Sequence, residues 1–411
     1  MTTEQRVLRA SEWDRWYGAL ELAFGGVADS DGVRALWRSL TEHERSIGVW
    51  DGDDCVGTAG AFSFRLSVPG GALVPAAGVT MVSVAATHRR RGILTSMMRR
   101  QLDDVRELGE PLAVLTASEP AIYGRFGYGI ASQQLSAEIE TASARIALPD
   151  GVDEIRLRRV DPDDPAVREA CEAIYAAEVA TRPGMLARSP GWDKLPVVDS
   201  GLEKGGMSPL QCVLAERDGE TVGYTHFRNK PEWSRSGPRG TIELRDVYAP
   251  DPVAYAALWR FLFGIDLTTT IQARSRPADD PFLHLVTDIR RCNVRQRDSL
   301  HLRPVEVGAA LEARTYRTPV DVVFEVEDRF CRWNEGRWRL IGDAKGASCE
   351  RTRDTADLAL SVRELGAAYL GGVTLAALAR AGRVKELRPG ALAEASTAFA
   401  SDIAPWLPHG F

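Results

Sequence analysis

The sequence lacks the cysteine and histidine patterns of a zinc-binding domain. None of its six cysteines forms a C-x-x-C pair, and none has a histidine at the spacing of a metal ligand. Cysteines used in this way behave as small apolar residues in a reducing compartment. We therefore expect no metal and a cytoplasmic location.

Long apolar segments are also missing. A membrane-spanning helix needs about 18 or more consecutive apolar residues, and no such stretch occurs in the chain. The first residues, MTTEQRVLRASEWDRW, do not contain the apolar core of a signal peptide. The net charge of −6 leaves no basic excess for phosphate contacts. The sequence therefore predicts neither a membrane nor a nucleic acid as a partner.

Two glycine motifs of nucleotide-binding proteins are absent as well. The chain has neither G-x-G-x-x-G nor the Walker pattern G-x-x-x-x-G-K-[ST], which disfavours a dinucleotide-binding fold and a nucleoside triphosphatase. It has instead VSVAATHRRRGILTSMMRRQL at residues 82–102, where an apolar strand pattern gives way to three arginines, Gly92 and a helix pattern. This corner is either a solvated basic turn or a site that holds phosphates.

The phosphate interpretation has a physical basis. The first backbone N–H groups of a helix have no partner within the helix, and the helix dipole favours anions at the same end. Gly92 lets a ligand approach the backbone, and Arg89 and Arg90 add positive charge. The sequence therefore predicts an anion site at the start of helix 92–107, with Arg91 facing solvent and His88 as a solvated loop cap.

The chain length of 411 residues predicts two or three domains, because single cores rarely exceed about 250–300 residues. The first unit, 1–150, has the predicted order α, α, β, β, β, β, α, β, α, β and is mixed α/β. The second unit, 151–299, repeats part of it, since CVLAERDGETVGYTHFR (212–228) matches VWDGDDCVGTAGAFSFR (49–65). The repeat lacks the basic glycine corner. A corner needed only for folding should occur in both copies, so its loss favours a functional role.

The third unit, 300–411, has alternating strand patterns at 320–328 and 336–344 and helical spacing at 358–372 and 374–382. It ends in FASDIAPWLPHGF, where two prolines prevent a helix and predict an extended tail.

The hexad Arg89-Arg90-Arg91-Gly92-Ile93-Leu94 resembles the coenzyme A loop, R/Q-x-x-G-x-G/A, of the GCN5-related N-acetyltransferases (GNAT). Leu94 departs from the usual last position. Together with LTASEPAIYGRFGYGIAS (115–132), however, the loop resembles the Eis (enhanced intracellular survival) branch of that family, which also carries leucine there. The resemblance spans essentially the whole chain. It implies an α/β (α+β) protein with tandem GNAT-like domains, the second degenerate, followed by a sterol-carrier-protein-like α/β domain.

The resemblance also implies an activity: transfer of acetyl from acetyl-CoA to primary amines of small molecules, aminoglycosides among them, by direct attack in a ternary complex. Backbone groups at the end of the strand would hold the thioester, and the basic loop would hold the pyrophosphate. Ser118 either contacts the cofactor or caps the helix that follows it. The expected cofactor-binding residues are Val82, Ser83, Val84, Arg89, Arg90, Gly92, Ile93 and Ser118.

Two residues are implied in catalysis. Tyr123 lies where the family has its general acid, which gives a proton to the departing coenzyme A thiolate. Tyr128 is the neighbouring alternative, and either tyrosine could merely pack in a core. The C-terminal carboxylate, on Phe411, is expected to accept the amine proton through water. The alternative for Phe411 is a frayed chain end.

Phe24, Trp37 and Phe64 are the expected substrate-binding residues, with a place in the helix core as the alternative for Trp37. Gly26 and Gly410 occupy positions that are acidic in the aminoglycoside-modifying member of the family, and Thr116 occupies the position of its pocket histidine. The lower negative charge should weaken the binding of polycations.

The family further implies a homohexamer, a trimer of dimers. Two alternative functions stay open at this point. One is a different tandem-GNAT acyltransferase, of the thiol-synthase or aminoacyl-transferase type. The other is a lipid carrier that uses the C-terminal domain.

Overall fold

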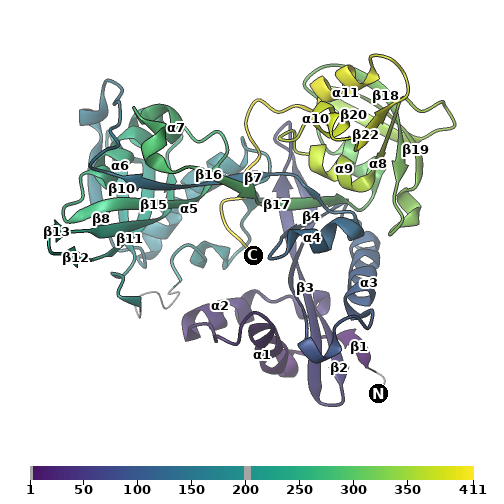
Figure 1. Cartoon of the computed structure of the whole chain (residues 1–411), viewed down its shortest axis with the longest axis horizontal. Coiled ribbons are helices and arrows are strands. Elements are labelled where there is room, and N and C mark those ends of the chain that lie inside the picture. Colours follow the sequence, from purple (N-terminus) through teal and green to yellow (C-terminus); the bar gives the residue numbers. More distant parts are fainter. Residues whose placement is uncertain (1–2, 199–204) are drawn as a thin grey trace.

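The computed structural model describes residues 3–198 and 205–411, which form three domains (Figure 1). Among these residues, no helix is both long enough and apolar enough to cross a bilayer.

The first domain follows the predicted order of elements with two differences: strand β1 precedes the first helix, and three strands rather than four lie between the second and third helices. It contains β1 (Glu4–Val7), α1 (Trp13–Ala23), α2 (Asp31–Leu40), β2 (Ile47–Asp51), β3 (Asp54–Ser67), β4 (Leu73–Val84), α3 (Ile93–Glu107), β5 (Leu112–Thr116), α4 (Pro120–Tyr123) and β6 (Gly129–Ile130). The β2–β3 hairpin turns at Gly52, whose φ of 62° suits glycine. Helix α3 buries Met98, Leu102 and Val105 against the sheet at helical spacing.

The second domain repeats this plan. It contains β8 (Arg156–Val160), α5 (Pro165–Val179), β9 (Leu186–Ala187), β10 (Gln211–Arg217), β11 (Glu220–Lys230), β12 (Trp233–Ser234), β13 (Gly237–Pro238), β14 (Gly240–Tyr248), α6 (Pro252–Phe263), β15 (Thr268–Pro277), α7 (Phe282–Leu285) and β16 (Arg295–Asp298). In both domains an antiparallel hairpin leads into a long strand, which is followed by a helix and a parallel strand: β4 with β5 and β14 with β15.

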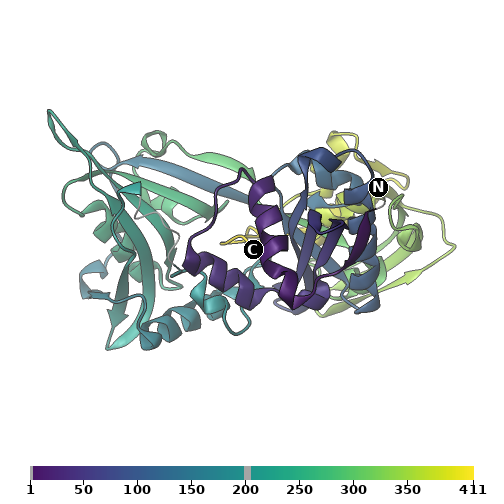
Figure 2. The ribbon, with the colours of Figure 1, turned by 90° about the horizontal axis from the view of Figure 1, so that it is seen from below.

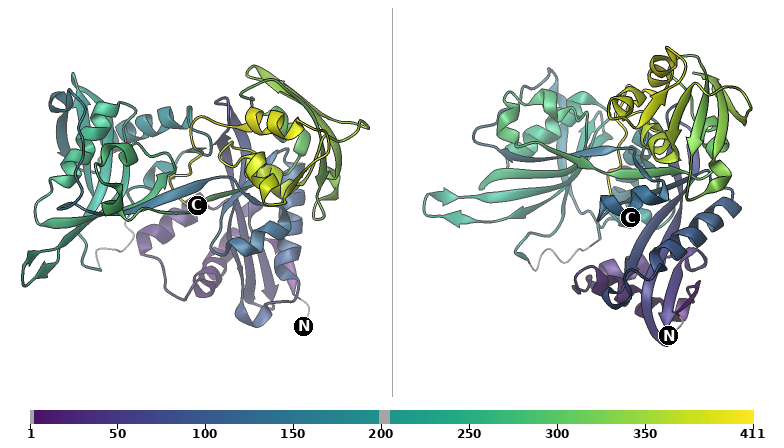
Figure 3. Two further views of the ribbon diagram at one scale, coloured as in Figure 1. Left: turned by 45° about the horizontal axis from the view of Figure 1, so that its top comes forward. Right: turned by 45° about the vertical axis from the view of Figure 1, so that its right-hand side comes forward.

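The two domains exchange strands (Figures 1 and 3). Strand β7 (Gln133–Glu140) leaves the first domain and pairs with β15 and β16 in the second sheet, whose order is β16-β7-β15-β14-β11-β10-β8. Strand β17 (Leu300–Pro304) returns and lies between β5 and β6 in the first sheet, whose order is β1-β2-β3-β4-β5-β17-β6, with β9 added on β3. The boundaries at 150 and 299 stay predictions, and the single strand expected near 129–140 is divided between two sheets.

The third domain has a sheet of order β20-β19-β18-β21-β22 covered by helices. Its elements are α8 (Val307–Glu312), β18 (Val320–Glu327), β19 (Gly336–Asp343), β20 (Gly346–Arg351), β21 (Leu358–Ser361), α9 (Val362–Ala368), α10 (Leu375–Arg380), β22 (Val384–Glu386) and α11 (Ala391–Phe399). The prediction of one helix over 358–372 is wrong at its start, because Leu358–Ser361 pairs parallel with β18 before the helix begins. One hydrophobic core joins this domain to the first, with Phe62 and Phe324 in the same cluster.

Candidate active site

Strand β4 is distorted where the site lies. Met81 and Val82 together oppose Ala59 of β3, which makes a β-bulge, and Met81 has a positive φ of 52°. The parallel pairing of β4 with β5 ends at Gly78 and Val114. Beyond that point the described part of β4 has no strand partner on its β5 side. Backbone groups around Val82–Val84 are therefore available to a ligand, while the Ser83 hydroxyl is engaged by Thr58 Oγ1 at 2.7 Å.

The N-terminus of α3 opens beside this bulge. Gly92 is the N-cap residue with a φ of 82°, and no side chain caps the first turn. The equivalent helix of the second domain, α6, is capped by Asp251, whose carboxylate accepts hydrogen bonds from the backbone N–H groups of Val253 and Ala254 at 2.7 and 3.1 Å. An anion could bind the first helix in the way that the second already binds its own carboxylate. The second domain thus has the equivalent strand and helix, but its own Asp251 carboxylate occupies the helix N-terminus where an anion could otherwise bind.

A cleft of about 570 Å³ joins these features. All eight expected cofactor-binding residues line it, together with Tyr123, His88 and Phe24. Arg91 is exposed and does not belong to the lining, as expected. Arg90 has a positive φ of 63°, an uncommon conformation for a side-chain-bearing residue, which bends the loop around the helix end.

The two tyrosines have different environments. Tyr123 is half-buried in the cleft, and burial, with a contribution from Glu119, raises the pKa of its phenol. Tyr128 is 1% exposed, packs edge-on against Tyr123 and has a hydroxyl without a partner among the described residues. Only Tyr123 can reach a ligand in the cleft.

Ser118 and His88 do not have the capping roles that the sequence suggests for them. Glu119, not Ser118, occupies the N-cap position of α4, so capping does not account for Ser118. His88 is half-buried rather than solvated, because its Nε2 lies 3.2 Å from a carboxylate oxygen of Asp51.

The C-terminus lies between the first two domains (Figures 1 and 2). Thr80 Oγ1 donates a hydrogen bond of 2.8 Å to a carboxylate oxygen of Phe411, and the Phe411 ring packs edge-on against Phe64 at 5.0 Å. A Cβ at Gly78 would lie 2.2 Å from the Phe64 ring and 3.2 Å from the Phe411 ring, so these rings rest on bare β4 backbone. The chain end is therefore bound to Thr80, which precedes the cleft-lining residue Val82 by two positions in β4.

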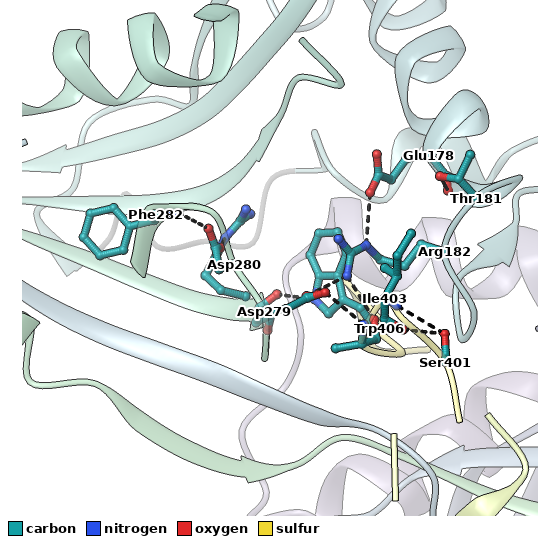
Figure 4. A network of polar contacts seen from close by, with 12 residues as sticks. Glu178, Thr181, Arg182, Asp279, Asp280, Phe282, Ser401, Ile403 and Trp406 are labelled. Atoms are coloured by element: carbon teal, nitrogen blue, oxygen red, sulfur yellow. Dashed lines mark hydrogen bonds and ion pairs between the residues drawn. The ribbon is translucent and has the colours of Figure 1, made fainter. Parts of the chain in front are cut away.

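A polar network fixes the tail that carries Phe411 (Figure 4). Arg182 bonds Glu178 of α5, Asp279 and the carbonyl oxygen of Ala404, at 3.0, 2.7 and 2.9 Å. Asp279 also accepts from the backbone N–H of Ala404, and Trp406 Nε1 donates to the carbonyl oxygen of Ser275. The tail is therefore tied to the second domain at both its polar and its apolar positions.

The expected substrate residues lie in two places. Trp37 and Phe64 join Phe62, Trp192 and Phe411 in an aromatic cluster with ring centroids 4.9 to 6.0 Å apart. Phe24 lies apart, 60% exposed at the edge of the cleft that Tyr123 lines. Phe62 shares a face of β3 with Phe64, so alternation could have identified it. Trp192 comes from the second domain, and no sequence signal links it to this site.

His409 completes the surroundings of the cluster. It lies near Trp192 and Tyr175, and burial, with the nearby Arg188 guanidinium, lowers its pKa to about 3. Its imidazole is therefore neutral at physiological pH and does not offset the negative charge of the Phe411 carboxylate.

Known proteins match every part of this architecture. GNAT acetyltransferase domains match residues 4–131 and 184–304, and a sterol carrier protein domain matches residues 307–408. An uncharacterized N-acetyltransferase of Streptomyces avermitilis is 69% identical over 100% of both chains. The N-acetyltransferase Eis of Mycobacterium tuberculosis is 35% identical over 95% of this chain and 96% of its own. The crystal structure of Eis1 from Mycobacterium abscessus is 35% identical, with a TM-score of 0.82 over 100% of both chains.

These matches confirm the predicted fold, with two GNAT domains followed by a sterol-carrier-like domain. They also confirm the predicted class of enzyme. The chain belongs to the Eis family of GNAT proteins and is an N-acetyltransferase.

Proposed function

We propose that this enzyme transfers acetyl from acetyl-CoA to a primary amine of a small molecule, in one step within a ternary complex. The observation that carries the proposal is the single cleft in which the bulged end of β4, the open N-terminus of α3 and Tyr123 meet. Arg89, Arg90 and the first N–H groups of α3 would bind the pyrophosphate. The β4 backbone near Val82 would donate to the thioester oxygen as negative charge develops on it.

Two proton transfers complete the reaction. The amine nitrogen attacks the thioester carbonyl carbon, and the carbon–sulfur bond breaks. The leaving sulfur takes the Tyr123 proton, which the raised pKa of that phenol keeps in place at neutral pH. The amine loses a proton through water to the carboxylate of Phe411, which Thr80 orients. Solvent then restores the starting protonation of both groups.

The surroundings of Phe411 favour one kind of amine. The aromatic cluster offers apolar faces, and the carboxylate beside it carries a single negative charge. Gly26 and Gly410 add no acidic side chain, and no atom lies within 4 Å of a Cβ built on Gly410. We expect an amine on an apolar or aromatic body to be a better substrate than a polycationic aminoglycoside.

A thiol-release assay tests the proposal. Purified enzyme with acetyl-CoA is offered aminoglycosides, aliphatic diamines, lysine peptides and arylalkyl amines, and products are identified by mass spectrometry. We expect release of coenzyme A in step with amine acetylation, with the highest kcat/KM for arylalkyl amines. Binding of acetyl-CoA without acetylation of any of these amines would contradict the proposed amine class. A lack of acetyl-CoA binding would contradict the proposed cleft.

The hydrogen bonds that hold the C-terminal tail, from Thr80 to Phe411 and from Arg182 to Ala404, support a role for the third domain in placing Phe411 rather than in carrying lipid. The interior of this domain is filled by the rings of Tyr316 and Phe399 around the buried Arg314 guanidinium, which donates to the carbonyl oxygen of Phe399. A buried cation is an unsuitable neighbour for an acyl chain. Lipid copurifying with an enzyme that has no transferase activity would favour the carrier function.

We also propose a homohexamer, a trimer of dimers, on the basis of the family alone. Light scattering or sedimentation equilibrium would measure the assembly, and a monomer at micromolar concentration would contradict it.

A further inference from the structure

A second cluster of reactive side chains lies in the second domain, away from the cleft. Cys171 on α5, Cys212 on β10 and His226 on β11 place one ligand atom each within 4.8 Å of one another, and all three residues are buried. Cys212 and His226 are directly paired across the antiparallel strands, and α5 brings Cys171 onto them. No spacing in the sequence indicates this group, because its members come from three separate elements.

The next strand orients the histidine. Asp246 of β14 is the cross-strand partner of His226, at a register shift of β11 against β14. Its Oδ1 lies 2.8 Å from His226 Nδ1 and 3.2 Å from the His226 backbone nitrogen. A hydrogen on Nδ1 that is donated to the carboxylate leaves the lone pair on Nε2. Metal-binding histidines in proteins are oriented by this kind of carboxylate partner.

We propose that Cys171, Cys212 and His226 bind one zinc ion, and that Asp246 orients His226 from outside the coordination sphere. Two thiolates and one neutral imidazole are ligands that zinc prefers, and the thiolates neutralise its charge in a buried site. Three protein ligands leave a fourth position for water. Zinc, two thiolates and a neutral imidazole would together form a compact unit without net charge.

The ion would fasten α5 to the sheet next to the tail. Cys171 and Cys212 share a hydrophobic cluster with Tyr175 and Trp406, and Tyr175 donates to the carbonyl oxygen of Leu186. Trp406 belongs to the tail that ends in Phe411. Because of this position, we expect the ion to stabilise the surface that holds the chain end.

Metal analysis of the full-length enzyme tests the proposal. After expression with zinc and exhaustive dialysis, we expect about one zinc per chain in the wild type and far less in Cys212→Ser and Cys171→Ser. Cys292→Ser is the matched control, since Cys292 is also free and buried in the second domain but belongs to another cluster. It should keep its zinc.

Cobalt gives a measurement that needs no variant. Co²⁺ added to metal-free wild-type enzyme should produce a thiolate charge-transfer band and the strong visible absorption of a tetrahedral site, both abolished by competing zinc. Zinc should also raise the melting temperature of the metal-free wild type. A wild type that holds no zinc and gives no cobalt spectrum, equal zinc in Cys212→Ser, or a Cys171–Cys212 disulfide in the native enzyme would overturn the proposal.

Discussion

At the scale of single residues, Tyr123 and Tyr128 form a natural matched pair. Tyr123→Phe should lower kcat by about 10²–10⁴-fold, the usual contribution of a general acid, with little change in the affinity for acetyl-CoA. Tyr128→Phe removes a hydroxyl that has no partner among the described residues, so we expect kcat and stability near the wild type. Steady-state kinetics and isothermal titration with acetyl-CoA measure both. A wild-type kcat in Tyr123→Phe would contradict its role as the general acid.

The pH profile of the reaction reports on the same phenol. Burial, and to a smaller extent the negative charge of Glu119, raises the pKa of Tyr123. The protonated phenol is the active acid, so activity persists through neutral pH and falls only as pH rises through this pKa. Glu119→Gln removes the repulsion and should move the alkaline limb of kcat to lower pH. If the alkaline limb of kcat stays at the same pH, a group other than Tyr123 is responsible for it.

At the scale of elements, the three arginines before α3 allow direct contact with acetyl-CoA to be distinguished from long-range electrostatic attraction. Arg89 and Arg90 line the cleft, whereas Arg91 is exposed outside it. The double variant Arg89→Ala/Arg90→Ala should raise KM for acetyl-CoA by about tenfold or more, because a hydrogen bond to a charged group contributes about 1.5–3 kcal/mol. Arg91→Ala is the control with the same change of side chain, and initial-rate kinetics compare them. An equal rise in KM for Arg91→Ala would indicate long-range attraction rather than direct contact.

Patterns local in sequence predicted the elements that line the proposed cofactor cleft. The β2–β3 hairpin, the long strand and the helix starting at Gly92 depend on turn residues and periodicity that neighbours share. The helix prediction is wrong at Leu358–Ser361 because four residues rich in apolar side chains fit either period, and only the parallel partner β18 decides between helix and strand. The exchange of β7 and β17 was not predictable, because a strand pattern does not specify which sheet the strand joins.

Long-range contacts limited the prediction of the site in the same way. The end of β4 and Tyr123 belong to continuous motifs, and the structure brings them to one cleft. Trp192 packs on Phe64 from another domain, and Thr80 bonds a residue at the opposite end of the chain. Such pairs arise from the packing of whole domains, so no single stretch of sequence contains them.

At the scale of the whole molecule, the proposed reaction depends on a chain end that the second domain holds. Arg182, only 12% exposed, joins α5, Asp279 and the carbonyl oxygen of Ala404, and its guanidinium lies over Trp406. Arg317 makes a comparable ion pair with Asp402, but both partners are mostly exposed. Exposed pairs contribute about 0–1 kcal/mol, whereas removing one partner of a buried group also leaves the other partners unpaired.

This difference gives a matched test of the tail. Arg182→Met should lower kcat several-fold or more and leave KM for acetyl-CoA unchanged, because the tail loosens while the cofactor cleft stays intact. Arg317→Met should change neither value appreciably. Carboxypeptidase digestion provides a readout independent of catalysis, since release of Phe411 follows the fraction of molecules with an open tail. Release should be faster in Arg182→Met than in Arg317→Met or the wild type. Faster release of Phe411 with unchanged kcat would show that the Phe411 carboxylate does not take part in the reaction. Unchanged release would show that contacts other than those of Arg182 hold the tail.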